Sequence, residues 1–244
     1  MPASLFDIQF GVNIHPWEDE SLVASLKRIT GMGYNGVEVT NRTYRNYSDR
    51  VFILKEIVND IGIQVISYVL KMDFTLLSMD SALLNRFERL AGFIRKVGGR
   101  YVIVEQGIEA RWNADLGEQL AHFERVLTDF AGICTDNGVE LVYHPTPDSF
   151  ILSSEIMDRV VETIYPLGTR ICFDVCDFLQ LGIHPIQFMK KYFDAISVIH
   201  LNDMRITKGK HAHCFNEPDH KILGQGKVDL DSIWTFLQAM EFKG

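Results

Sequence analysis

Residues 138–144 read Gly-Val-Glu-Leu-Val-Tyr-His, and they follow a segment of helical period that runs from Leu116 to Asn137. Glycine directly after a helix is the usual left-handed stop. The short apolar run behind it is typical of a strand that is buried on both faces. This stretch therefore predicts a helix, a tight turn and a buried parallel strand, in that order.

The same unit recurs along the whole chain. The expected strands lie at Asp7–Ile14, Gly36–Val39, Gln64–Val69, Tyr101–Val104, Val139–His144, Arg170–Asp174 and Ser197–Leu201. The expected helices lie at Ser21–Thr30, Arg50–Ile61, Ala82–Val97, Leu116–Asn137, Ser153–Tyr165, Pro185–Phe193 and Leu230–Met240. Repeated strand–helix order predicts a parallel sheet that is covered by helices.

Seven such units fit into 1–244, without a Pro/Gly/Ser-rich linker between them. An open doubly wound sheet would carry a glycine-rich phosphate turn after its first strand, but residues 13–17 read Asn-Ile-His-Pro-Trp. We therefore predict one α/β domain over residues 1–244, a (β/α)8 TIM-type barrel that lacks its eighth strand. Such a gap leaves unpaired strand edges, so a homo-oligomer is an expected alternative to a less stable monomer.

The amino-acid composition restricts the kinds of partner and the cellular location that we expect for this protein. The 244 residues carry 24 Lys+Arg against 32 Asp+Glu, a net charge of −8, which disfavours general binding to nucleic acid. No apolar run approaches the roughly 20 residues that span a bilayer, and residues 1–20 lack the pattern of a signal peptide. Four cysteines are too few for a disulfide framework, so we expect reduced thiols and a cytoplasmic location.

Three consecutive expected strands end in a polar residue, namely His144, Asp174 and His200. Each lies two positions after a small or apolar residue of its own strand, which places both on one face. Reacting groups of a barrel lie at the C-terminal ends of its strands. Two imidazoles and a carboxylate there favour a divalent metal site over three residues that merely bond nearby loops.

Three acids lie near this triad and are the candidate catalytic groups. Glu38 and Glu105 end the second and fourth expected strands, and Asp177 follows Asp174 by three positions. For the two glutamates, contact with substrate, orientation of a metal ligand, and a bond to their own loop are all open.

Three further residues are candidates for substrate binding. His15 and Trp17 follow the first expected strand, where they would form an apolar wall for a small ligand. Lys71 follows the third strand, where it would hold an anionic or hydroxylated substrate. The alternatives are that Trp17 packs within its own loop and that the Lys71 side chain extends into solvent.

The chain resembles the xylose isomerase-like superfamily of barrels, which includes sugar phosphate isomerases and epimerases. Five segments carry this resemblance in their order and spacing. They are Gly33–Val39, Tyr143–Thr146, Phe173–Asp177 with Gly182–Pro185, Val198–Asp203, and Leu223–Asp229.

The resemblance implies a divalent metal, one of Mn, Mg, Co or Zn, held by residues from strands five to eight. Asp174 and His200 match two expected ligands, and His144 matches the branch that has histidine where many members have glutamate. The fourth ligand of the family is a glutamate at the end of strand eight, which would follow Gly244.

The resemblance further implies an isomerase or epimerase that acts on a small sugar or sugar-like hydroxyketone by moving a proton next to a carbonyl. A dehydratase acting on a cyclic polyol ketone needs the same metal and proton abstraction, and is the first alternative. A binding domain with an incomplete site is the second. A DNA-repair endonuclease of the same superfamily is disfavoured by the net charge of −8.

Overall fold

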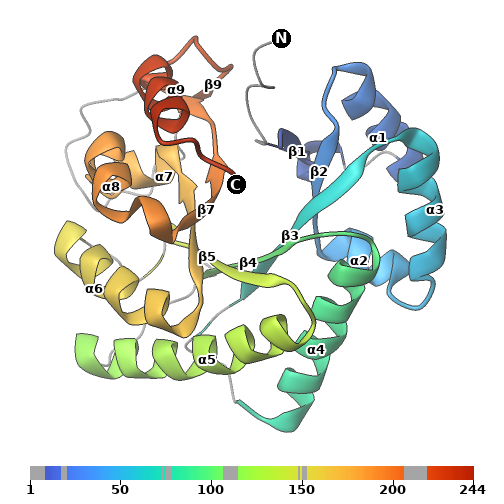
Figure 1. The fold of residues 1–244 in the computed structure, drawn as a ribbon, viewed down its shortest axis with the longest axis horizontal. Coiled ribbons are helices and arrows are strands. Elements are labelled where there is room, and N and C mark those ends of the chain that lie inside the picture. Colours follow the sequence, from blue (N-terminus) through green and yellow to red (C-terminus); the bar gives the residue numbers. More distant parts are fainter. Residues whose placement is uncertain are drawn as a thin grey trace.

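A curved parallel sheet with helices along its outer face forms the body of the protein (Figure 1). The computed structural model describes residues 9–17, 21–72, 74, 79–106, 115–147, 149, 153–205 and 219–244. The sheet has seven strands in the order β1-β2-β3-β4-β5-β6-β7, so each strand pairs with its neighbour in the sequence. All six pairings are parallel.

The strands of this sheet are β1 (Gly11–Asn13), β2 (Gly36–Val39), β3 (Gln64–Met72), β4 (Tyr101–Gln106), β5 (Glu140–His144), β6 (Arg170–Asp174) and β7 (Ile196–His200). A separate antiparallel pair consists of β8 (Asp203–Met204) and β9 (His220–Lys221). The α-helices are α1 (Leu22–Gly31), α2 (Asn41–Tyr47), α3 (Val51–Ile61), α4 (Ser81–Lys96), α5 (Leu116–Asp136), α6 (Ser154–Ile164), α7 (Val175–Gln180), α8 (Pro185–Tyr192) and α9 (Leu230–Ala239).

The predicted barrel with seven strands is confirmed. Within the described residues, no strand pairs with the outer edge of β1 or of β7. The first strand is shorter than predicted, because only Gly11–Asn13 pair with β2, and residues 7 and 8 lie outside the described part of the chain. The sequence analysis missed two short helices, α2 and α7, and the β8–β9 pair.

Side-chain caps and glycines set the ends of the long helices. Asp80 and Asp115 accept the backbone N–H three residues ahead, at the starts of α4 and α5, and so satisfy donors that a helix leaves free. After α3, Gly62 has φ 74°, a left-handed conformation that favours glycine. Gly138, between α5 and β5, has the same left-handed conformation, with φ 69°. The predicted helix–glycine–strand unit therefore exists.

Two apolar clusters hold the sheet. The larger one lies between the strands and the helices outside them. The smaller one lines the inner face of the sheet and consists of Tyr101, Ile103, Val142 and Cys172. In β5 and β6, His144 and Asp174 follow two positions after Val142 and Cys172, so they occupy the next inward layer toward the C-terminal ends of the strands. No helix among the described residues is long and apolar enough to cross a membrane.

Asp203 anchors the segment that follows β7. Its side chain is buried, and its carboxylate accepts the backbone N–H groups of Met204, Gly224, Gly226 and Val228 at 2.7–3.1 Å. A Cβ atom at Gly226 would lie 2.0 Å from the Asp203 carboxylate, so only glycine fits there. This carboxylate therefore holds the turn after β9 against the start of β8.

We expect Asp203→Asn to lower the free energy of unfolding by about 1–3 kcal/mol, because an amide NH2 would face backbone donors that lose their acceptor. Urea denaturation measures the change. Asp219→Asn is the matched control, since Asp219 lies at the same hairpin but is exposed and pairs with Arg205 and Lys221. A surface pair of that kind contributes only about 0–1 kcal/mol.

The contribution of Asp203 to the stability of the fold depends on pH. Burial raises the pKa of Asp203, but the four backbone N–H groups outweigh burial and hold the pKa below its usual value. The charged carboxylate therefore stabilises the fold above the usual pKa of an aspartate, and this contribution is lost as the pH falls toward the lowered value. Equal acid sensitivity of wild type and Asp203→Asn would contradict the assignment.

Candidate metal centre

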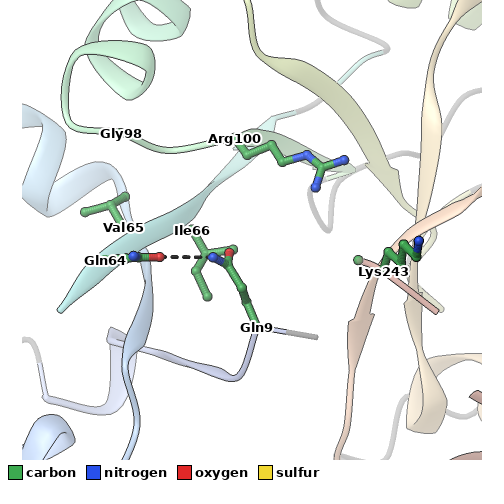
Figure 2. A pocket seen from close by; sticks show the side chains of 8 residues that line it. Gln9, Gln64, Val65, Ile66, Gly98, Arg100 and Lys243 are labelled. Atoms are coloured by element: carbon green, nitrogen blue, oxygen red, sulfur yellow. Dashed lines mark hydrogen bonds between the residues drawn. The ribbon is translucent and has the colours of Figure 1, made fainter. Parts of the chain in front are cut away.

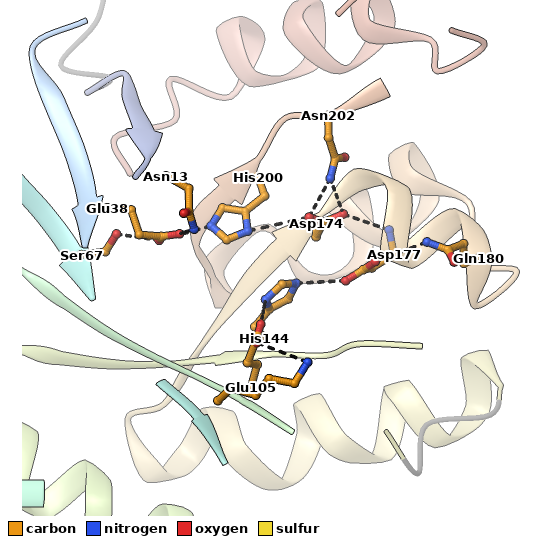
Figure 3. Close-up of polar contacts among 11 residues, drawn as sticks. Asn13, Glu38, Ser67, Glu105, His144, Asp174, Asp177, Gln180, His200 and Asn202 are labelled. Carbon is orange, nitrogen blue, oxygen red and sulfur yellow. Dashed lines mark hydrogen bonds and ion pairs between the residues drawn. The ribbon is translucent and has the colours of Figure 1, made fainter. Parts of the chain in front are cut away.

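His144, Asp174 and His200 meet at the C-terminal ends of β5, β6 and β7 (Figure 3). Asp174 and His200 are paired in the register of β6 and β7. The two imidazole rings lie 5.2 Å apart between centroids and are nearly perpendicular. The spacing in the sequence predicted this convergence, and their role as metal ligands stays a prediction.

Asp174 is held in place from two directions. Its Oδ1 accepts the backbone N–H of Asp177 at 2.9 Å, which caps the short helix α7. The side-chain amide of Asn202 donates to both carboxylate oxygens, at 2.9 and 2.8 Å. Asn202 in turn accepts the backbone N–H of Cys176. The orientation of the Asp174 carboxylate is therefore fixed before any ligand binds.

His200 stands between two carboxylates. Its Nε2 lies 3.3 Å from Oε2 of Glu38, and its Nδ1 lies 3.7 Å from Oδ2 of Asp174. Glu38 is buried and accepts hydrogen bonds from Asn13 and Ser67, both at 2.7 Å. Glu38 thus fixes one side of the imidazole and leaves the other side facing Asp174.

His144 has the same kind of surroundings. Its Nδ1 lies 3.2 Å from Oε2 of Glu105, and its Nε2 lies 3.2 Å from Oδ2 of Asp177. Yet neither nitrogen has a hydrogen-bond partner of good geometry in the described part of the chain, although both are buried. Each histidine therefore has a glutamate beside one ring nitrogen and an aspartate beside the other.

The carboxylates raise the pKa of both imidazoles. Burial lowers the pKa of His144, but Asp177 and Glu105 outweigh burial and raise it to about 10. Burial likewise lowers the pKa of His200, and its contacts with Cys172 and Glu38 raise it well above the usual value. Without a bound cation, these contacts therefore favour the protonated form of both rings.

The pKa values of the acids move in different directions. Burial raises the pKa of Glu38, but His200, Ser67 and Asn13 outweigh burial and hold it below the usual value. Burial also raises the pKa of Glu105, but its contact with His144 outweighs burial and lowers the pKa below the usual value. For Asp177, burial and the negative charge of Asp174 raise the pKa. Together they outweigh the contact with His144, which lowers it.

These residues fit a divalent cation. Four carboxyl groups surround two imidazoles, so negative charge is in excess even when both rings are protonated. Ligand atoms held about 2.0–2.2 Å from a tetrahedral metal lie about 3.4 Å apart, close to the 3.7 Å between His200 Nδ1 and Asp174 Oδ2. Potential ligand atoms of His144, Asp174 and Asp177 all lie within 4.8 Å of one another. A glutamate behind a ligating histidine is the usual second partner of such rings.

The remaining candidates lie at the edge of this cluster or apart from it. Lys71 is half-exposed, with Nζ 3.9 Å from Oε1 of Glu105. His15 is exposed, and its backbone N–H donates to Asn13, which itself bonds Glu38. Trp17 ends the 3-10 helix η1 (His15–Trp17), and its side chain lies outside the described part of the structure.

The sequence analysis missed several residues of the centre. Asn13 and Asn202 lie at or just after the ends of strands. This position could have indicated a role in the site, but many loop residues share it. Ser67 lies inside β3, and nothing in the sequence reveals that it faces Glu38. In the sequence, Cys172 is a small residue of the inward layer, and it was not expected to bind metal because Cys172 and Cys176 lack the second cysteine pair of a structural zinc site.

A cavity of about 560 Å³ lies at the opposite end of the sheet (Figure 2). Gln64 at the start of β3 and Arg100 just before β4 line it, together with Gln9 and Lys243. Gln9 and Gln64 bond each other there at 3.0 Å. Because the cavity is at the N-terminal ends of the strands, it is separate from the candidate metal centre.

A protein-family model described as a xylose isomerase-like TIM barrel matches residues 26–244. The chain belongs to this family. The family assignment agrees with the resemblance in the sequence and with the observed barrel. In a barrel of this kind the reacting groups lie at the C-terminal ends of the strands, which is where the candidate centre is found.

Curated relatives of this family member carry enzyme names. An inosose dehydratase of Geobacillus kaustophilus is 26% identical over 208 residues, which cover 80% of this chain and 65% of the relative. An inosose dehydratase of Clostridium botulinum is 22% identical over 236 residues, which cover 87% of this chain and 76% of the relative. The chain thus spans about two thirds to three quarters of the length of these enzymes. Their names favour the dehydratase alternative over the isomerase expectation.

Solved structures share the fold at low identity. The IolI protein with a bound zinc atom has a TM-score of 0.80 and 16% identity, covering 97% of this chain and 87% of that one. A probable 3-DHS dehydratase, AsbF of Bacillus anthracis, has a TM-score of 0.80 and 11% identity, covering 96% and 90%. A 3-keto-D-glucoside 4-epimerase of E. coli has a TM-score of 0.76 and 14% identity, covering 97% and 89%.

We expect Asp174→Asn to weaken Zn²⁺ binding at least ~10-fold, as even changes behind the ligands do, because the variant removes the negative charge that faces both His144 and His200. Calorimetric titration of the purified 244-residue protein measures the affinity. Asp158→Asn is the matched control, since Asp158 lies on α6 and pairs with Lys191 at the surface. Equal affinity in wild type and Asp174→Asn would remove Asp174 from the centre.

Glu38→Gln tests whether the carboxylate behind His200 matters. We expect a ~10–100-fold loss of Zn²⁺ affinity, the usual cost of removing a carboxylate that orients a ligating histidine. Glu140→Gln is the control, because Glu140 lies at the other end of the sheet, where it accepts the Ser197 hydroxyl. If Glu38 only fixes its own loop, the Glu38→Gln and Glu140→Gln proteins will bind Zn²⁺ alike.

Proposed function

We propose that this protein is a metal-dependent dehydratase that removes water from a cyclic polyol ketone of the inosose type. The observation that carries the proposal is the group of two histidines and four carboxylates, all buried or partly buried, at the C-terminal ends of the strands. The inosose dehydratases among its relatives support the class of substrate.

In this proposal His144, Asp174 and His200 hold the metal, and Glu105 and Glu38 orient the two imidazoles. A divalent ion supplies one thing when bound: it polarises a substrate carbonyl and lowers the free energy of the enediolate that forms when the neighbouring C–H bond breaks. Mn, Mg, Co and Zn are all compatible with this role.

Asp177 is the group that we assign to proton transfer. It is the remaining acid beside the triad. Among the described residues its carboxylate has two long contacts, 3.2 Å to His144 and 3.4 Å to Gln180. Glu38 is less suited, because three partners hold its two oxygens. In the dehydration, Asp177 would take the proton from the carbon next to the carbonyl. The hydroxyl group on the following carbon would then leave as water after it receives that proton from Asp177.

The substrate would approach from the rim of the barrel. Lys71 presents a half-exposed ammonium group beside Glu105, suited to bind a hydroxyl or carbonyl oxygen. His15 and Trp17 follow β1 at the same end of the sheet and complete the proposed substrate contacts.

An isomerase or epimerase is the second candidate, because it shares the first proton abstraction. The two reactions separate afterwards: a dehydratase expels the hydroxyl group, whereas an epimerase returns a proton to the same carbon. NMR of an inosose incubated with the protein and Mn²⁺, Co²⁺ or Zn²⁺ in deuterated water distinguishes them.

We expect a product that has lost one water. Deuterium at the carbon next to the carbonyl with the hydroxyl retained would instead identify an epimerase, and an unchanged substrate with every metal would contradict both enzymes.

Asp177→Asn should lower kcat ~100-fold or more, at the low end of the effect of removing a general base. Its Zn²⁺ affinity should stay within a few fold of wild type, measured by the same calorimetry as for Asp174→Asn. A loss of metal affinity as large as that of Asp174→Asn would make Asp177 a ligand and refute its assignment as the proton carrier.

A further inference from the structure

Cys172 lies directly beneath the candidate metal centre. It is on β6, two residues before Asp174, and its side chain is fully buried on the inner face of the sheet with Ile103 and Val142. In the sheet register it is paired with Val198, two residues before His200. The thiol therefore occupies the layer below the two histidines and the aspartate, on the central strand of the three.

The thiol is within reach of both imidazoles. Potential ligand atoms of His144, Cys172 and His200 all lie within 4.8 Å of one another. His144 is 6% exposed, and neither of its ring nitrogens has a hydrogen-bond partner of good geometry among the described residues. A buried imidazole (His144), a partly buried one (His200) and a buried thiol within this distance form a set of nitrogen and sulfur ligands.

This set overlaps a second one of different chemistry. His144 also belongs to the group with Asp174 and Asp177, which offers mainly oxygen. Oxygen ligands suit Mg²⁺ and Mn²⁺, whereas thiolate and imidazole select Zn²⁺ and similar ions. The sulfur is therefore the atom that distinguishes these ions at this centre.

We propose that the Cys172 thiolate is a ligand of the bound metal, together with His144 and His200, and that it makes the centre prefer Zn²⁺ and Co²⁺ to Mg²⁺ and Mn²⁺. The inference rests on the metal centre of the proposed function, and goes beyond it by naming the ligand that selects the ion. On binding, the S–H bond breaks, the sulfur donates its electron pair to the metal, and the proton passes to solvent.

The absorption spectrum of the Co²⁺-loaded 244-residue protein tests this directly. A Co²⁺–thiolate bond gives a charge-transfer band in the near ultraviolet, which nitrogen and oxygen ligands do not give. We expect the band in wild type and its loss in Cys172→Ser. Cys134→Ser is the matched control and should keep it, because Cys134 lies buried on α5, away from the centre.

Metal selectivity gives a second readout. The ratio of the affinities for Zn²⁺ and Mn²⁺, measured by competition, should fall at least ~10-fold in Cys172→Ser, since the lost ligand favours only the softer ion. Bound Co²⁺ without the charge-transfer band in wild type would overturn the proposal, even if Cys172→Ser does not fold. A band that survives in Cys172→Ser, or that is lost in a control variant instead, would also overturn it.

The proposed function and the assignment of Cys172 as a ligand can be refuted independently of each other. A protein that shows the band but leaves inosose unchanged refutes the dehydratase and keeps Cys172 as a ligand. A protein that dehydrates inosose without the band keeps the enzyme and removes Cys172. Failure to bind Co²⁺ at all would overturn the ligand assignment, and the dehydratase would then be decided by the NMR assay with the other metals.

Discussion

The register of β5, β6 and β7 is the constraint on which the candidate centre depends. Because side chains alternate between the two faces of a strand, a slip of one residue in β6 would move Asp174 and Cys172 out of the barrel and into the helical layer. The pairing of Asp174 with His200 excludes that arrangement. The apolar cluster around Ile103 and Val142 supports the register, since it fills the layer beneath the polar one.

The chemistry of the centre follows from a balance of buried charges. Acids alone at this depth would repel one another, and imidazoles alone would remain neutral. Together, Glu38 and Glu105 keep His200 and His144 in charged, oriented forms. A divalent cation that replaces the two ring protons leaves the net charge of the cluster unchanged, so the same arrangement is suitable with and without metal.

Much of the fold could be predicted from the sequence, because its signals are local. Helix–glycine–strand units at Gly62 and Gly138 specify a parallel sheet, and the period of two at the ends of β5 to β7 specifies the triad. Contacts between distant strands carry no such signal. Ser67 beneath Glu38 and Asn202 on Asp174 depend on how neighbouring units pack, so they became visible only in the structure.

The order of the strands has a consequence for the growing chain. Each of β2 to β7 pairs with the strand that precedes it in the sequence. During synthesis, every new strand therefore leaves the ribosome when its partner is already present, and the sheet can lengthen one unit at a time. The triad is contributed by the last three strands of the sheet, so a nascent chain would build most of its barrel before it has any place to bind a metal.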